Sequence, residues 1–384
     1  MTDSFDVVIV GAGAIGAACA YFITREGLSV AIVDKGPVVS GTTGAGEGNI
    51  LVSDKEPGPE LDLALLSNQL WRALTDDLAG PAELEAKGSL VIAAHQRSLT
   101  ALAYLAQRQR AAGVEAQPAD AYELAALEPN IALGLAGGML YPQDMQVQPM
   151  LAAAHLLRLA RSRGATVLPG REVTDIPRDA SGRVTGVRTS KGTINTRIVV
   201  NAAGTWGGEV AAMAGVTVPV LPRRGFILVT EPLPHVIRHK VYAAEYVANV
   251  ASSSEGLEIS AVVEGTASGP VLIGASRERV GFDRTISWPV VAKLARHAIT
   301  LFPFLTDVRA LRTYHGFRPY CPDHLPVIGP DARAPGLFHA CAHEGAGIGL
   351  APATGRLIAQ AVAGVALDLP LQPFRPDRFE ESLV

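Results

Sequence analysis

The sequence has 384 residues, of which 48% are hydrophobic, and this length and composition support a large core and two domains. Its 33 basic and 37 acidic residues give a net charge of −4 without runs of like charge, so we expect neither a nucleic-acid partner nor binding to anionic membranes. Three scattered cysteines, Cys19, Cys321 and Cys341, exclude a disulfide framework and lack metal-ligand spacing. We therefore expect no metal site and a reducing, cytoplasmic compartment.

The first 35 residues contain a complete strand–helix–strand unit. An apolar run at 7–10 predicts a buried parallel strand, the sequence GAGAIG follows at 11–16, a helical pattern extends over 14–26, and a second strand covers 30–33. Residues 7–23 carry no charge, but the acidic segment before them and their three glycines argue against a signal peptide or a transmembrane segment.

The glycine turn has the features of a dinucleotide-binding site. Gly11 permits the tight turn, Gly13 lets the backbone approach a pyrophosphate, and Gly16 lets the helix pack closely on the strands. The free N–H groups and the positive dipole end of the helix face the phosphates. Asp34, at the end of the second strand, is placed to accept hydrogen bonds from the adenosine ribose, and its charge disfavours the 2′-phosphate of NADP.

The next segments predict further ligand contacts and an inserted layer. Residues 37–49 are rich in glycine and hydroxyl side chains and lie beyond the carboxyl end of the second strand, where α/β proteins bind ligands. Helices are expected at 61–78, 99–112 and 150–163, and strands that form a separate layer begin at residue 88.

A second strand–turn–helix returns the chain to the first sheet. The apolar strand 198–200 leads into the small-residue turn 201–204 and a helix over 208–214. Residues 217–315 then show strand-like runs separated by turn signals and predict an antiparallel sheet, in which KVYAAEYV at 240–247 forms one strand.

The last segment contains a second glycine-rich loop, at 343–349. It feeds a helix expected over 353–365, with Pro352 in the first-turn position that proline favours. Such a loop at a helix N-terminus predicts a second site for an anion or a carbonyl oxygen.

Six motifs in order resemble the FAD-dependent D-amino-acid oxidase family, which includes glycine oxidase, sarcosine oxidase and D-amino-acid dehydrogenases. They are GAGAIG at 11–16, Asp34, Thr42-Thr43, NAAGTW at 201–206, GFRPYCPDHLPVIG at 316–329 and HEGAGIGLAPATG at 343–355. Within this family, residues 47–67 look most like the β subunit of D-hydroxyproline dehydrogenases and opine oxidases, which are built from several different chains.

The resemblance implies an α/β (α+β) fold, with a Rossmann-like FAD-binding domain and an inserted substrate domain built on a mixed, antiparallel sheet. The FAD-binding domain is expected to comprise residues 1–87, 146–216 and 316–384. The substrate domain is expected to comprise residues 88–145 and 217–315.

The resemblance also implies which residues surround the FAD. The expected cofactor-binding residues are Gly11, Gly13, Ala14, Ile15, Gly16, Asp34, Lys35, Thr42, Thr43, Gly46, Glu47, Gly48, Asn49, Val173, Ala202, Ala203, Gly204, Trp206, Glu344, Gly345, Ala346, Gly347, Ile348 and Gly349. Cys321 stands five residues after Gly316, where some family members attach the flavin through a cysteine. We expect no thioether here and therefore a non-covalent FAD.

Two residues are expected to act on the substrate. Arg318 matches the arginine that binds the substrate carboxylate in glycine oxidase, a role that suits a planar, permanently charged guanidinium; the alternative is a surface arginine in a salt bridge. Tyr246 is the phenol expected to assist it. Lys240 and Lys293 lack the context of the lysine with which sarcosine oxidase promotes reaction with oxygen, so we favour a dehydrogenase.

The expected reaction is hydride transfer to flavin N5 from the Cα of an amino or imino acid of the D-hydroxyproline or opine type. We expect the chain to be the catalytic β subunit of a hetero-oligomer, with positioning supplying most of the catalysis. Two alternatives stay open. One is a self-sufficient glycine, sarcosine or D-amino-acid oxidase that makes peroxide, and the other is a non-catalytic, flavin-bearing subunit.

Overall fold

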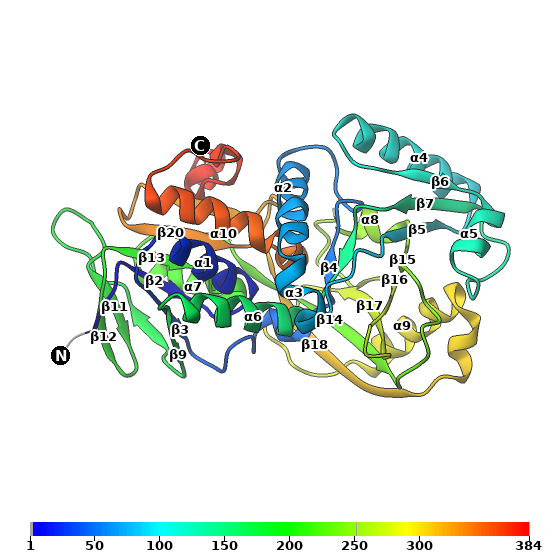
Figure 1. Ribbon diagram of the computed structural model, residues 1–384, viewed down its shortest axis with the longest axis horizontal. Coiled ribbons are helices and arrows are strands. Elements are labelled where there is room, and N and C mark those ends of the chain that lie inside the picture. Colours follow the sequence, from blue (N-terminus) through cyan, green and yellow to red (C-terminus); the bar gives the residue numbers. More distant parts are fainter. Residues whose placement is uncertain (1–2, 251, 384) are drawn as a thin grey trace.

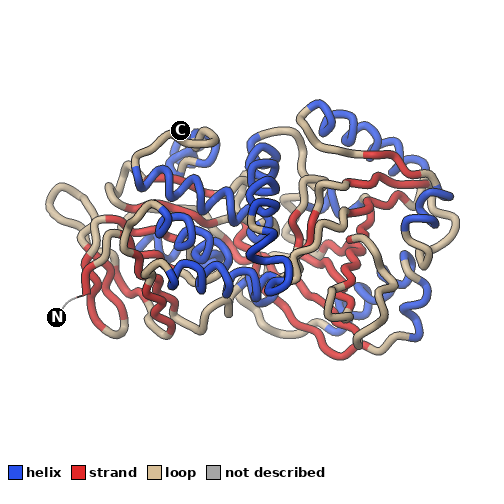
Figure 2. The backbone as a smooth tube through the Cα atoms, viewed as in Figure 1, coloured by secondary structure: helices blue, strands red, loops and turns tan. Residues whose placement is uncertain are grey.

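The computed structural model describes residues 3–250 and 252–383 and shows two lobes side by side (Figure 1). The terminal lobe contains both ends of the chain and is built on a six-stranded sheet, whereas the inserted lobe is built on an eight-stranded sheet. Each lobe combines strands with helices (Figure 2), which confirms the α/β fold class expected from the sequence.

The six-stranded sheet places β2 at its centre. The order is β19 (Val327–Pro330), β20 (Leu337–Cys341), β13 (Ile198–Asn201), β2 (Val7–Val10), β3 (Val30–Asp34) and β9 (Thr166–Pro169). All neighbours are parallel except β19, which pairs antiparallel with β20. Strand order reverses at β2, because β3 lies on one side of it and β13 on the other. A ligand crevice is expected at the carboxyl ends of strands at such a point.

Side chains of β2 alternate between two cores. Val7 and Ile9 join a cluster with α1 (Ala14–Arg25), α6 (Pro149–Ser162) and α10 (Gly347–Ala363), whereas Val8 and Val10 join a cluster on the opposite face. That face is covered by α7 (Gly207–Met213) and by a sheet in the order β1 (Asp3–Ser4), β12 (Gly192–Asn195), β11 (Gly186–Thr189), β10 (Val173–Asp175). Burial on both faces explains why β2 is an uninterrupted apolar run.

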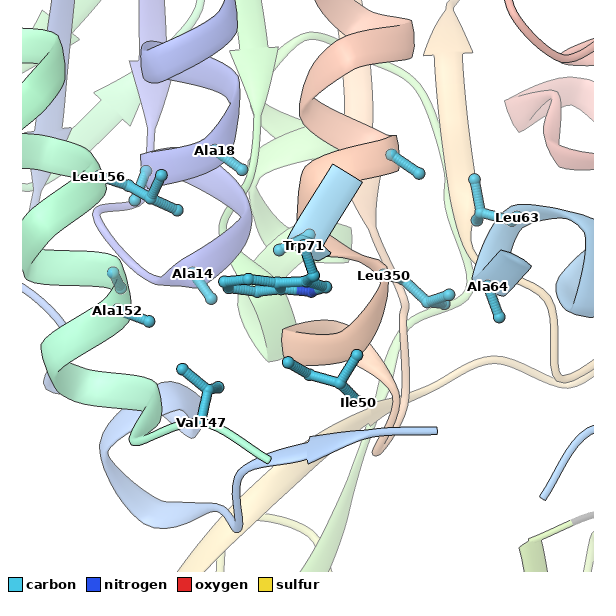
Figure 3. Packing of buried hydrophobic residues seen from close by; sticks show 14 of the residues in the cluster. Ala14, Ala18, Ile50, Leu63, Ala64, Trp71, Val147, Ala152, Leu156 and Leu350 are labelled. Atoms are coloured by element: carbon cyan, nitrogen blue, oxygen red, sulfur yellow. The ribbon is translucent and has the colours of Figure 1, made fainter. Parts of the chain in front are cut away.

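Trp71 anchors α2 (Pro59–Ala73) in the terminal lobe, just before α3 (Thr75–Ala82). Its indole is fully buried and lies among side chains of α1, α6 and α10 (Figure 3). Trp71 Nε1 and Ser67 Oγ both donate to the carbonyl oxygen of Gly349, at 3.0 and 2.6 Å.

The expectation that Pro352 opens the last helix is wrong, because α10 begins at Gly347 and contains Pro352. Pro352, the sixth residue of α10, has no N–H to donate, and side chains of α2 bond to the backbone on either side of it, at Gly349 O and Ala353 N.

The inserted lobe is a mixed, mainly antiparallel sheet with helices packed against it. The strand order is β18 (Ala310–Tyr320), β14 (Leu221–Thr230), β17 (Val271–Arg277), β16 (Glu258–Gly265), β15 (Lys240–Ala243), β5 (Ser89–Ala93), β7 (Gly137–Tyr141) and β6 (Gln117–Ala119). Helix α9 (Trp288–Leu301) packs on β14, β16 and β17, and α4 (Gln96–Ala111) packs on β5 and β7, with α5 (Ala121–Leu127) beside β7. Strands β4 (Asn49–Ile50) and β8 (Met145–Gln146) pair separately.

Two details of this lobe differ from the sequence reading. The expected strand 240–247 ends at Ala243, and helix α8 (Glu245–Val250) carries Tyr246. A short apolar run with several alanines fits the two-residue period of a strand as well as the 3.6-residue period of a helix. Here the helix forms, and it packs on β16. Strand β18 continues in the eight-stranded sheet beyond residue 315, where the domain boundary was expected. Within the described residues, no helix is both long and apolar enough to cross a membrane.

Candidate functional site

A cavity of about 580 Å³, here called the cofactor cavity, opens at the carboxyl ends of β2, β3 and β13. Most of the residues expected to bind a cofactor line it: Gly11, Gly13, Ala14, Ile15, Asp34, Lys35, Thr42, Thr43, Gly46, Glu47, Asn49, Val173, Ala202, Ala203, Gly204, Trp206, Glu344, Gly345, Gly347 and Ile348. Segments far apart in the sequence therefore meet around one space, at the point where strand order reverses.

The glycine turn at the start of α1 leaves room for a ligand at only one of its three glycines. A Cβ on Gly11, whose φ is +111°, would lie 2.4 Å from the carbonyl oxygen of Ala202, and a Cβ on Gly16 would lie 1.9 Å from that of Gly11. A Cβ on Gly13 would meet only Thr43 Oγ1, at 3.1 Å. Gly13 thus borders open space beside the helix N-terminus, as the approach of a pyrophosphate requires.

Four of the expected cofactor-binding residues do not line this cavity. Gly16, Gly48 and Gly349 face backbone instead, since a Cβ would lie 1.7 Å from Val147 O at Gly48 and 2.9 Å from Asn49 O at Gly349. Ala346 lines a neighbouring cavity. The three glycines shape the walls through close packing, which spacing in the sequence does not distinguish from ligand contact.

Asp34 and a stacked set of side chains form one end of the cofactor cavity. The Asp34 carboxylate accepts hydrogen bonds from Ala12 N and Gly36 N, each at 2.8 Å, and each oxygen keeps lone pairs for a ribose hydroxyl. Lys35 Nζ lies 3.9 Å from the centre of the Trp206 ring, which stacks on Phe282 at 5.5 Å. A carboxylate beside a flat apolar surface fits an adenosine.

The helix α10 presents its N-terminus to the same cavity. Gly347 begins the helix and lines the cavity, so the positive end of the helix dipole lies at the wall. His343 also lines the cavity, and its Nε2 lies 3.0 Å from Thr354 Oγ1. Burial lowers the pKa of His343 to about 3, so its imidazole is neutral at physiological pH. The positive helix end is suited to negative charge on the ligand.

Glu47 connects the cofactor cavity to a buried ion pair. Lys240 Nζ lies 2.6 Å from Glu264 Oε2, both side chains are 1% exposed, and Gly48 N donates to Glu264 Oε1 at 3.2 Å. Burial raises the pKa of Glu47, although the charge of Lys240 opposes this shift. Lys240 itself does not line the cofactor cavity, and Lys293 is exposed on α9.

A second cavity of about 600 Å³, here called the substrate cavity, adjoins the first. Arg318, Tyr246, Glu344 and Gly345 line both, so the two residues expected to act on a substrate lie together at the junction. Arg318 donates from one terminal nitrogen to Ser276 O at 2.8 Å and forms no ion pair with a described residue. Burial and the nearby Arg277 lower the pKa of Arg318 to about 10, so it remains charged at neutral pH.

The sequence reading missed Arg277, which also lines the substrate cavity. This arginine is only 4% exposed, ends β17, donates to Asn249 O at 2.8 Å and lies over the Tyr246 ring at 5.2 Å. A charged side chain at the end of the apolar run VLIGAS was the available signal, since an interior charge needs a partner or a function.

Comparisons with known proteins agree with this geometry. The sequence model of the family described as FAD dependent oxidoreductase matches residues 6–361. The chain is 32% identical to hydrogen cyanide synthase subunit HcnC of Pseudomonas aeruginosa, over 99% of this chain and 97% of the relative. It is also 32% identical to glycine oxidase of Geobacillus kaustophilus, over 97% of both.

Solved structures share the fold over almost the whole length. The crystal structure of the glycine oxidase from Geobacillus kaustophilus has a TM-score of 0.89 at 30% identity, covering 98% of this chain and 99% of that one. L-proline dehydrogenase from P. horikoshii has a TM-score of 0.90 and covers 100% and 99%, but at 23% identity it bears on the fold alone.

Proposed function

Because the chain belongs to the family of FAD-dependent oxidoreductases, we propose that it binds FAD non-covalently in the cofactor cavity and oxidises the C–N bond of an amino or imino acid. The observation that carries this proposal is the position of Arg318 and Tyr246 at the junction of the two cavities. A carboxylate held there by Arg318 keeps its own Cα beside the cofactor cavity.

The residues of the cofactor cavity fit FAD. Gly13 and the N-terminus of α1 would hold the pyrophosphate, Asp34 would bind the ribose, and the N-terminus of α10 would stabilise negative charge on the flavin ring. When bound, FAD supplies the acceptor for the hydride that leaves the substrate Cα. Loss of hydride leaves an iminium ion, which gives up its N–H proton to water as an imine, and this imine adds water and releases the amine to give a keto product or, when cyclic, persists. Cys321 is fully buried, burial raises its thiol pKa, and it lines neither cavity, which supports non-covalent binding.

The protein's contribution to the reaction is positioning. The Arg318 guanidinium orients the carboxylate, and the phenol of Tyr246 lies at the same junction, with burial raising its pKa so that it remains a neutral hydrogen-bond donor. Glu344 also lines both cavities. Its carboxylate lies 3.7 Å from the Arg223 guanidinium, which compensates its charge. Orientation of the Cα–H bond then accounts for most of the acceleration.

We further propose that the substrate is of the D-hydroxyproline or opine type and that the chain is the β subunit of a cytoplasmic hetero-oligomeric dehydrogenase. The resemblance of residues 47–67 supports the subunit role, and three unpaired, buried cysteines support the compartment. A self-sufficient oxidase remains the second candidate, favoured by the similarity to glycine oxidase along the whole chain.

Anaerobic flavin bleaching with Arg318 variants tests the assignment. A charge-assisted hydrogen bond is worth about 1.5–3 kcal/mol, so Arg318→Ala should lower kcat/KM by roughly 10- to 100-fold. Arg318→Lys should recover part of this loss, and FAD content should remain normal. Equal damage on substrates with and without a carboxylate would mean that Arg318 is structural. Rapid peroxide formation by the isolated chain would favour the oxidase.

A further inference from the structure

The substrate cavity contains two guanidinium groups that form no ion pair with a described carboxylate, although the charge of Glu47 in the cofactor cavity acts on one of them, Arg318. Arg318 and Arg277 each donate to one backbone carbonyl, Ser276 O and Asn249 O, and neither forms an ion pair with a described residue. They are close enough for Arg277 to lower the pKa of Arg318. Arg277 is 4% exposed and Arg318 is half-buried, and two neighbouring like charges with so little access to water are unfavourable unless an anion compensates them.

Glu245, one of the five acidic side chains around this cavity, is exposed to solvent and accepts a hydrogen bond from Ser98 Oγ at 3.4 Å, and the other four are engaged elsewhere. Their ion pairs are Asp54 with Lys55, Glu56 with Arg108 and Glu344 with Arg223, at 2.7, 2.8 and 3.7 Å. Glu60 also lines the cavity, but burial raises its pKa, and the charges that act on it most strongly are those of Lys55 and Asp54. None of these carboxylates forms an ion pair with Arg277 or Arg318, and a carboxylate of the ligand can supply one.

The two arginines occupy different positions. Arg318 lines both cavities, whereas Arg277 lines the substrate cavity alone. A carboxylate on Arg318 thus places the reacting carbon next to the cofactor cavity, and a ligand that continues into the substrate cavity reaches Arg277. The volume of about 600 Å³ lies in the range of sites that take ligands much larger than glycine.

We propose, on the basis of the proposed function, that the substrate is an amino or imino acid with a second carboxylate, which Arg277 binds while Arg318 binds the first. Arg277 is then the residue that selects dicarboxylates. Its planar fork matches a carboxylate, and its hydrogen bond to Asn249 O and its contact with the Tyr246 ring hold it in place.

Ligand titration of the FAD-loaded protein tests this without turnover. The probes are malonate, succinate and glutarate, each compared with the monocarboxylate of equal carbon number, and the readout is the perturbation of the visible flavin spectrum. We expect at least one dicarboxylate to bind the wild type 10- to 100-fold more tightly than its partner. Arg277→Met should reduce this ratio to about 1–3. The control Arg296→Met, on the exposed face of α9, should leave the ratio unchanged.

If the methionine variant fails to fold, Arg277→Gln, which can still donate to Asn249 O, replaces it. A wild type without dicarboxylate preference, or a preference that survives both substitutions, overturns the inference. Anaerobic bleaching separates this from failure of the proposed function. If glycine, sarcosine, D-proline and iminodiacetate all leave the flavin oxidised, the proposed function fails. If the monocarboxylates bleach it as efficiently as iminodiacetate and Arg277→Met changes nothing, only this inference fails.

Discussion

Replacing Lys240 by methionine should destabilise the folded protein by about 3–5 kcal/mol, because removing one partner of a buried ion pair leaves an uncompensated charge. Lys240 Nζ lies 2.6 Å from Glu264 Oε2, and both side chains are 1% exposed. Burial alone would lower the pKa of Lys240, but Glu264 and Glu47 outweigh it and raise that pKa. The methionine variant therefore leaves two carboxyl groups together without their cation.

The surface pair Arg188–Asp175 is a matched control. Its N–O distance is also 2.6 Å, but its side chains are 60% and 38% exposed, so Arg188→Met should cost less than about 1 kcal/mol. An unfolding entropy of about 2.1 cal/mol/K per residue gives roughly 0.8 kcal/mol/K for 384 residues. The melting temperature of the FAD-loaded protein should thus fall by about 4–6 °C for Lys240→Met and by about 1 °C for the control.

A double replacement, Lys240→Met with Glu264→Leu, should recover part of the loss, since an apolar pair avoids the cost of burying charge. Equal changes in melting temperature for Lys240→Met and Arg188→Met would refute the argument that burial, rather than bond length, decides the strength of these pairs.

Three further predictions concern FAD binding and the buried His343. Gly13→Ala should fold but bind FAD at least tenfold more weakly, since its Cβ enters the pyrophosphate space, while Gly80→Ala, with open space around it, should bind normally in a fluorescence titration. Acid precipitation should release all flavin into the supernatant, and a yellow pellet would mean a thioether at Cys321. His343 has a folded pKa of about 3, so the unfolded chain binds the extra proton below about pH 6.5. The contribution of neutral His343 to the free energy of unfolding is therefore fully present above that pH. It is lost as the pH falls towards 3, by at most about 1.4 kcal/mol per pH unit. His343→Gln should flatten this slope in denaturant titrations, and an unchanged slope would refute it.

The sequence by itself determined the first strand–helix–strand unit of the terminal lobe in detail. The run at 7–10, the turn at 11–16 and the acid at position 34 are contiguous, and their roles follow from local rules: buried strands are apolar, glycine permits close approach, and a strand end places its side chain at the ligand. The structure accordingly has β2, α1 and β3 within a residue or so of the expected bounds.

Only the tertiary structure decided the features that depend on distant segments. The start of α10 depends on Ser67 and Trp71 of α2, which bond to the backbone around Pro352 from nearly 300 residues away. Glycines that touch backbone and glycines that border a ligand look alike in sequence, and Gly13 and Gly48 are distinguished only by what surrounds them.

The substrate side shows the same limit. Arg318 follows from a motif, but the role of Arg277 depends on Arg318 of β18 and on Tyr246 and Asn249 of α8, two elements distant from it in the sequence. Whether a buried charge has a partner is a property of the space around it, and that space is formed when strands β17 and β18 and helix α8 meet. The residue that we assign to substrate selection therefore became recognisable only in three dimensions.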